Sequence, residues 1–152
     1  MNKTKNFGFT LIEILVVATI IGMLAAVAAV SYSSFTKSSR DARRKADMEQ
    51  IRAALEMYRS NSVNGQYPAA AAVSFTCPGN SPLSDGTNTY LTKIPNDPRC
   101  AAPTSYRYYY NPGAGLTDYS LGTTLENSTA NSACGNNCGG ACRYCMGPYG
   151  EK

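Results

Sequence analysis

Four cysteines lie close together near the C-terminus, in a CxxxCxxxCxxC pattern made by Cys134, Cys138, Cys142 and Cys145. Four thiolates at this spacing have the chemistry to hold zinc or an iron–sulfur cluster. The pattern differs from the paired CxxC motifs of zinc sites, however, and the glycines between these cysteines suit a tight loop closed by disulfides. We therefore favour disulfides and expect no metal, with a metal site as the alternative.

The other two cysteines, Cys77 and Cys100, are placed to close a loop of 24 residues. Such a crosslink stabilises a fold by about 3 kcal/mol in the chain-entropy model. All six cysteines fall in the second half of the chain, and an even number in one region is typical of a disulfide framework formed in an oxidising compartment. The pairing among six cysteines does not follow from their spacing, so the connectivity stays open.

The composition argues against an enzyme. The chain has 152 residues, of which 43% are hydrophobic and 16% are charged, and it contains no histidine. Histidine is the commonest general base and metal ligand, so Ser-His-Asp, Cys-His and HExxH chemistries are excluded. The sequence also lacks GxxxxGK[ST] and a GxGxxG that opens a helix, the usual nucleotide-binding motifs. We expect no catalysis and no cofactor.

The net charge of +4 comes from the first part of the chain. Positions 1–60 carry 9 Lys and Arg against 5 Asp and Glu, whereas positions 61–152 carry 5 of each. A nucleic-acid-binding surface needs a strongly basic face. The sequence therefore does not indicate nucleic acid as a partner.

One carboxylate, Glu13, interrupts an apolar stretch of 22 residues at positions 9–30. As a helix this stretch would be about 33 Å long, enough to cross the hydrocarbon core of a bilayer. A carboxylate in such a span is costly unless it lies near the interface or is paired. The plainer interpretations are a membrane anchor with an idle Glu13, or a signal peptide cut after the A-x-A sequence at 26–28. The length of the stretch and Glu13 itself argue against the signal peptide.

Three small residues in this stretch, Ala18, Gly22 and Ala26, are four positions apart. That spacing places them on one helix face, where small side chains let neighbouring helices approach closely. The row predicts helix–helix packing, and an alanine-rich anchor without a partner is the alternative.

The periodicity predicts one helix from about position 9 to position 61, followed by a small β domain. Beyond the apolar part, Met48, Ile51, Leu55 and Tyr58 form a single stripe on a charged helix. Asn, Gly and Pro between positions 61 and 68 end the helix.

The remainder of the chain holds all eight prolines and eleven of the thirteen glycines. We expect a long loop over 69–103, with a short turn of helix around Tyr90 and Leu91. Strands at 105–110 and 117–125 would pair as a hairpin, and a disulfide-stapled loop would follow Glu126. The fold class is therefore α+β, with a small antiparallel hairpin or meander domain packed on the second half of a long N-terminal helix.

The sequence from Gly8 to Glu13, GFTLIE, follows a short basic leader and precedes the apolar stretch. This arrangement resembles the N-terminal signature of type IV pilins and type II secretion pseudopilins, and the resemblance extends over positions 3–67. It implies that a prepilin peptidase cuts between Gly8 and Phe9 and that Phe9 becomes an N-methylated N-terminus. It also implies that Glu13 pairs with the Phe9 amine of a neighbouring subunit. The family's frequent later proline in this segment is missing here.

The resemblance implies four segments with different roles. Positions 1–8 would be the leader, 9–30 the membrane and assembly half of the helix, 31–60 its amphipathic half, and 61–152 the globular head. The partners would be like subunits in a filament, the prepilin peptidase, a membrane assembly platform, and membrane lipid before assembly. The precursor would cross the cytoplasmic membrane once, N-terminus in and C-terminus out, and the mature form would lie in an extracellular or envelope filament.

A second stretch, from Tyr90 to Pro98 (YLTKIPNDP), resembles the segment that follows the helix in major pseudopilins, where a tyrosine-rich hairpin also comes next. Those proteins bind calcium through an acidic C-terminal loop. Here only Glu126 and Glu151 are acidic after Asp118, so we expect that site to be absent. The six tyrosines over 90–119 are read as core and interface packing, with ligand stacking or electron transfer as the alternative.

Basic residues flank the apolar stretch on both sides. Lys3 and Lys5 precede it, and a larger cluster follows it at Lys37, Arg40, Arg43, Arg44 and Lys45. The positive-inside rule by count would place the cluster in the cytoplasm, but the cysteine-rich half and the family resemblance favour the reverse. The cluster is read as a solvated helix face, with inter-subunit salt bridges or headgroup contacts as the alternative.

The leading hypothesis is a structural subunit of a type IV pilus or a type II secretion-like pseudopilus. The alternatives are a minor or DNA-uptake pilin that acts as a binding module, and a monomeric, disulfide-stabilised protein that is secreted or anchored. The balanced charge of positions 61–152 argues against the binding module.

Overall fold

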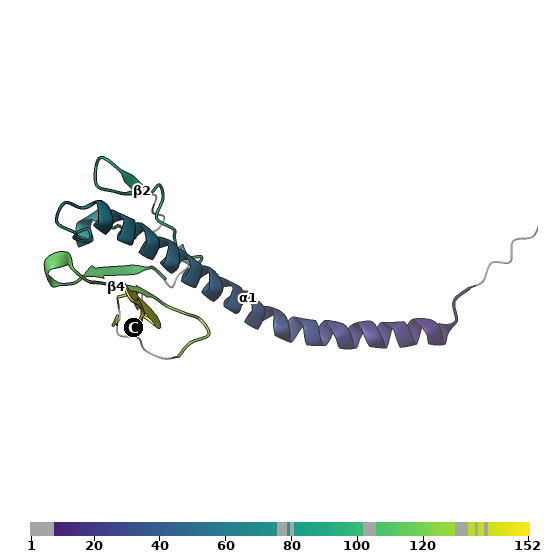
Figure 1. The fold of residues 1–152 in the computed structure, drawn as a ribbon. Helices are drawn as coiled ribbons and strands as arrows, with labels where there is room; N and C mark the ends of the chain where they lie inside the picture. The colour runs from purple at the N-terminus through teal and green to yellow at the C-terminus, as the bar shows by residue number, and fades with distance from the viewer. Residues whose placement is uncertain are drawn as a thin grey trace, which may run out of the picture. The chain divides into compact units, whose positions relative to one another are not determined.

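The computed structural model describes residues 8–75, 79, 81–101, 106–129, 134–135, 137–138 and 140–152. The chain divides into two compact units, Met1–Lys37 and Ser38–Lys152. Helix α1 (Leu11–Asn61) contributes its first part to the first unit and its second part to the second (Figure 1). The α+β class with a long apolar N-terminal helix and antiparallel sheets is confirmed.

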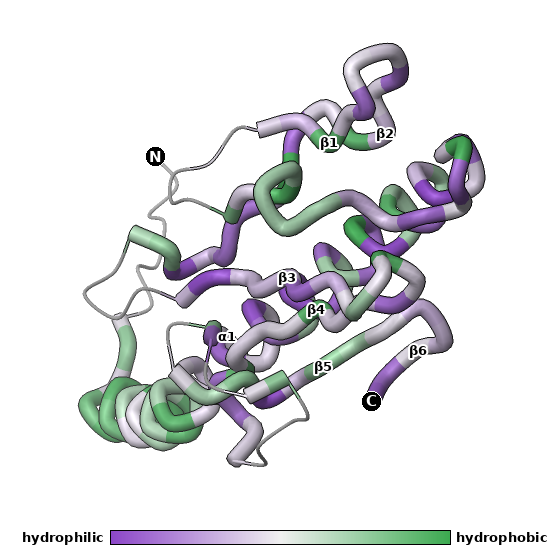
Figure 2. The backbone as a smooth tube through the Cα atoms, turned by 90° about the vertical axis from the view of Figure 1, so that its left-hand side faces the viewer, coloured by the Kyte–Doolittle hydropathy of each residue, from purple (hydrophilic) through white to green (hydrophobic). Residues whose placement is uncertain are grey.

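The first unit contains the apolar part of α1. The large apolar side chains from Leu11 to Val30 are exposed, and Figure 2 colours these helical turns green, as hydrophobic. By length and composition this helix is capable of crossing a membrane. Its apolar surface is therefore available to lipid or to other helices.

In the second unit, α1 supplies one wall of the core. Met48, Ile51, Ala54 and Leu55 are buried, so the stripe predicted from the spacing faces inward. The rest of the core comes from the loops and the sheet, and includes Tyr67, Val73, Leu83, Ile94, Tyr108, Tyr110, Tyr119, Leu121 and Met146. Of the six tyrosines over 90–119, the structure thus buries Tyr108, Tyr110 and Tyr119 in the core, as expected for packing residues.

The main sheet has four antiparallel strands in the order β3-β4-β5-β6. They are β3 (Tyr109–Pro112), β4 (Tyr119–Thr123), β5 (Tyr144–Gly147) and β6 (Gly150–Glu151). In the register, Leu121 lies between Tyr110 and Met146. The expected hairpin is present, but its first strand is β3 at Tyr109–Pro112 and not the predicted 105–110, since residues 106–108 precede the strand. The expectation of a loop throughout the segment after Glu126 is wrong, because its end returns along β4 and adds two strands (Figure 2).

A second, two-stranded sheet pairs β1 (Leu83–Ser84) with β2 (Thr89–Leu91). The expected helical turn at Tyr90 and Leu91 is therefore wrong, since Leu91 pairs with Leu83 and both side chains reach the core. The described residues also include two short 3₁₀ turns, η1 (Ala70–Ala72) and η2 (Ala114–Leu116). The second lies in the β3–β4 connection, where Gly115 takes a positive φ of 72° that suits glycine.

Candidate functional site

The expected processing site lies just before the start of α1. Gly8, Phe9 and Thr10 precede the first helical residue, and all three are exposed, with Phe9 83% accessible. No heavy atom of the described structure lies within 4 Å of the position that a Cβ on Gly8 would occupy. The bond between Gly8 and Phe9 thus lies in an accessible segment outside regular secondary structure.

Glu13 caps the start of the helix. The backbone N–H and the hydroxyl of Thr10 each donate to Glu13 Oε2 at 2.8 Å, and the N–H of Glu13 donates back to Thr10 Oγ1 at 3.3 Å. This reciprocal pattern is a capping box, which satisfies N–H groups that a helix start leaves unpaired. Among the described residues, no donor contacts Glu13 Oε1. The T-x-x-E spacing could have predicted the cap, which the sequence analysis missed.

The three small residues of the predicted packing row lie on the exposed apolar part of α1. Ala18, Gly22 and Ala26 are all solvent-accessible, and nothing described lies within 4 Å of a Cβ placed on Gly22. The three small side chains therefore leave room on this helix face for another helix to approach closely.

A buried ion cluster ties α1 to the loops of the second unit. The guanidinium of Arg44 donates from Nε to Asp97 Oδ2 at 2.7 Å and from Nη2 to Asp97 Oδ1 at 3.0 Å. Its Nη1 donates to Asp41 at 2.7 Å and to Glu126 at 2.9 Å. The side chains of Arg44 and Asp97 are completely buried. Burial lowers the pKa of Arg44, but the hydrogen bonds and charge of Asp97 outweigh it and keep the guanidinium charged.

Glu126 is the second centre of this cluster. Arg40 donates to it from Nε at 2.7 Å and from Nη2 at 2.6 Å, and Arg99 lies 3.4 Å away. The hydrogen bonds from Arg40 outweigh burial and lower the pKa of the Glu126 carboxyl to about 2. Asp41 accepts the backbone N–H of Glu126 at 2.9 Å, which anchors the chain after β4 to the helix.

These contacts correct the interpretation of the basic cluster at positions 37–45. Arg44 is buried and Arg40 is only 28% exposed, and both pair within the chain. The interpretation as a solvated helix face holds only for the three residues that are exposed, Lys37, Arg43 and Lys45. The sequence held two signals for the pairing, namely the D-x-x-R spacing of Asp41 and Arg44, and the P-x-D-P motif that contains Asp97.

The C-terminal cysteines form two nested disulfides. Cys134 bonds to Cys145, and Cys138 bonds to Cys142 inside that loop, with Cα separations of 5.6 and 5.3 Å. The four cysteines make a small buried cluster against Tyr109. Because the sulfurs are used in disulfides, the alternative of a metal site with four thiolates is wrong.

The first cysteine pair lies partly outside the described structure. Cys100 is disulfide-bonded, whereas Cys77 lies outside the described residues, so the Cys77–Cys100 pairing stays a prediction.

Gly122 of β4 makes room for the disulfide cluster. A Cβ at this position would lie 3.0 Å from the sulfurs of Cys138 and Cys142 and 3.1 Å from Cβ of Cys134. Only glycine lets the strand approach the two disulfides this closely. The sequence analysis did not single out this glycine, because nothing near it in the sequence indicates what packs over it.

Comparisons with known proteins identify the family of the chain. The family model described as "Prokaryotic N-terminal methylation motif" matches residues 3–29. The chain is 35% identical over 103 residues to the type II secretion system core protein G of Pseudomonas aeruginosa, covering 64% of this chain and 71% of that protein. The chain belongs to the pilin and pseudopilin family.

Other members of the family show how far the similarity extends. The core protein G of Aeromonas hydrophila is 28% identical over 103 residues, with the same coverage of 64% and 71%. The type IV major fimbrial protein FimA of Dichelobacter nodosus is 41% identical over 54 residues, which is 36% of this chain and 35% of that one. No solved structure matches.

Membership in the pilin and pseudopilin family identifies the chain as a structural subunit of a pilus or pseudopilus and not an enzyme. Family membership, together with the apolar helix, implies that the precursor is anchored in a membrane. It also implies that the subunit assembles with like subunits into a filament at the cell surface.

Proposed function

We propose that this protein is a core subunit of a pseudopilus of the type II secretion kind. The observation that carries the proposal is the extent of the similarity to core protein G, which covers 103 residues, against 54 for the fimbrial protein. A match of 103 residues is too long for α1 alone and must include much of the globular unit. The similarity over part of the globular unit therefore favours the pseudopilus.

The precursor would insert with its N-terminus in the cytoplasm, and a prepilin peptidase would cut between Gly8 and Phe9. The exposure of these two residues, which lie outside regular secondary structure, supports this step. N-methylation of Phe9 by the same enzyme would follow. A membrane assembly platform would then move the subunit from lipid into the filament.

Glu13 would guide this last step by pairing with the Phe9 amine of a neighbouring subunit. Its Oε2 accepts both hydrogen bonds from Thr10, and Oε1 points to no donor in the described part of the chain. One oxygen therefore holds the helix start, and the other remains for the neighbour's cation. A buried carboxylate in an apolar bundle requires such a partner.

The first test is intact-mass and N-terminal peptide analysis of the protein from its native cells. A chain that begins at N-methylated Phe9 supports the proposal. A chain that begins near Ala29 would show that signal peptidase released a soluble domain, and retention of Met1 would leave only an anchor; either result contradicts it.

A second test separates processing from assembly. Glu13→Ala should still yield N-methylated Phe9 but no filament in sheared fractions, and Ile14→Leu in the same turn serves as the control. Normal filaments from Glu13→Ala would contradict the proposed pairing.

A further inference from the structure

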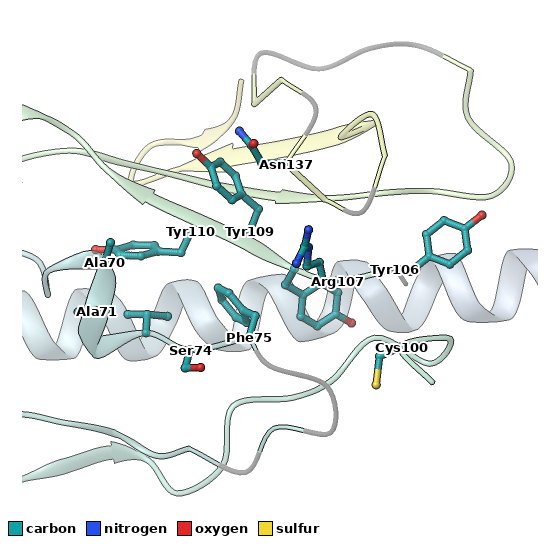
Figure 3. A pocket seen from close by; sticks show the side chains of 12 residues that line it. Ala70, Ala71, Ser74, Phe75, Cys100, Tyr106, Arg107, Tyr109, Tyr110 and Asn137 are labelled. Atoms are coloured by element: carbon teal, nitrogen blue, oxygen red, sulfur yellow. The ribbon is translucent and has the colours of Figure 1, made fainter. Parts of the chain in front are cut away.

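A groove of about 780 Å³ opens on the second unit beside strand β3. One side is formed by the segment from η1 to Phe75, and the other by consecutive residues from Tyr106 to Tyr110 (Figure 3). Tyr109 and Tyr110 begin β3, whereas Tyr106, Arg107 and Tyr108 lie just before it and outside regular secondary structure. The groove therefore runs along the first residues of β3 and the segment that leads into the strand.

Strand β3 is an edge strand in the described structure, since it pairs with β4 alone. The outer edge of such a strand presents backbone N–H and C=O groups that can pair with another extended chain. The groove thus provides a backbone template, with the rings of Phe75, Tyr106 and Tyr109 beside it. Its volume lies in the usual range of binding pockets.

The groove also carries one cationic side chain, that of Arg107. Arg107 is exposed, and no carboxylate of the described residues lies within ion-pair distance of its guanidinium. The other lining residues are uncharged. An occupant of this groove should therefore be an extended segment that brings a carboxylate and an apolar or aromatic side chain.

The opposite edge of the same sheet offers an extended segment with a carboxylate and an aromatic side chain. Strand β6 lies at the far end of the order β3-β4-β5-β6 (Figure 2). Its Glu151 is exposed and forms no ion pair within the described chain. Tyr149, in the turn just before it, is 95% exposed. An isolated aromatic ring this exposed, next to an unpaired carboxylate, complements the groove in both charge and shape.

We infer that the groove beside β3 receives strand β6 of a second copy of this chain, with Glu151 facing Arg107 and Tyr149 among the aromatic rings. The two surfaces lie at opposite edges of one sheet, so each copy offers one and accepts the other. Such a heterologous contact can propagate along a row of subunits when its rotation does not close a ring. The inference rests on the proposed function, because it adds a contact between globular units to the assembly by α1.

The test exchanges the two charges in the full-length protein. Arg107→Glu and Glu151→Arg each bring like charges together and should lower the amount of sheared filament by about tenfold or more. The double variant restores the attraction and should recover most of the filament. Lys93→Glu, which reverses an exposed cation outside the groove, is the matched control and should assemble normally.

The N-terminus of each variant distinguishes the two proposals. If the wild type itself forms no filament or does not begin at Phe9, the proposed function fails. If the wild type assembles and the single variants assemble equally well, or the double variant does not recover, the Arg107–Glu151 contact is wrong.

A photo-crosslinking amino acid at position 149 tests the same contact without changing a charge. It should give covalent dimers in filaments, with the adduct mapped to residues 70–75 or 106–110 of the second copy. The same probe at Val63, which is fully exposed, should not label these segments. An adduct from position 149 elsewhere would overturn the inference.

Discussion

Arg44 in α1 and Asp97 in the loop after β2 form a two-point ion pair in the interior, with N–O distances of 2.7 and 3.0 Å. The two residues are 53 positions apart in the chain. Because both side chains are completely buried, neither charge can be solvated if the other is lost. The pair therefore fixes the loop to the helix at a defined place.

Replacing Arg44 by alanine should destabilise the globular unit by about 3–5 kcal/mol, because it leaves the charge of Asp97 buried and unpaired. Urea unfolding of the detergent-solubilised full chain, followed by tyrosine fluorescence, measures the change. Arg43→Ala is the control, since its side chain is 66% exposed and such a change should cost no more than about 0.5 kcal/mol. Equal effects of the two substitutions would contradict the role of the buried pair.

Stability should fall in acid because of Glu126. Its pKa is about 2 in the folded protein, below the ordinary 4.5, so the folded state favours the ionised carboxylate. This stabilisation is complete above pH 4.5 and is lost as the pH falls towards 2. Unfolding free energies between pH 6 and pH 2 should show this slope, and Glu126→Gln should flatten it. An unchanged slope in that variant would assign the acid sensitivity to other groups.

Gly122→Ala should destabilise the unit by about 1–3 kcal/mol, because the added methyl group would crowd the Cys138 and Cys142 sulfurs at 3.0 Å. The thermal unfolding midpoint measures this effect. Ser120→Ala, in the same strand but partly exposed, should leave the midpoint nearly unchanged. If Gly122→Ala were as stable as the wild type, the disulfide cluster would not pack against β4 as described.

Gly22→Leu should leave the folded subunit unchanged and impair the filament. Nothing in the described structure lies near this position, so the larger side chain costs nothing within one subunit, whereas it keeps a neighbouring helix at a distance. Unfolding of the solubilised protein and the yield of sheared filament together test this. Ile21→Leu is the control on the adjacent helix face, and normal filament yield from Gly22→Leu would argue against the small-residue row.

Local patterns were enough to predict the helix and part of the β domain. The apolar run and the stripe through Met48, Ile51 and Leu55 depend only on helical periodicity, which neighbouring residues determine. Alternating tyrosines around a Gly- and Pro-containing connection predicted the hairpin of β3 and β4, although β3 begins later than expected, at Tyr109. These features need no knowledge of distant contacts.

Strands β5 and β2 were missed because their signals are not local. Tyr144–Gly147 lies in a segment rich in Gly, Asn and Cys, and it becomes a strand because β4 offers it a partner. Tyr90 and Leu91 have no strong local preference, and pairing of Leu91 with Leu83 decides their conformation. Propensity in short strands is weak, and tertiary pairing overrides it.

The class of this protein follows from local sequence, because the short motif from Gly8 to Glu13 and the apolar run after it consist of consecutive residues. Which charges and which cysteines meet depends instead on the folded arrangement. Arg44 and Asp97, like Cys134 and Cys145, come together through the packing of segments that are separate in the chain. Burial makes the ion pair important for stability, because an unpaired charge raises the free energy of the folded state strongly only where water is excluded.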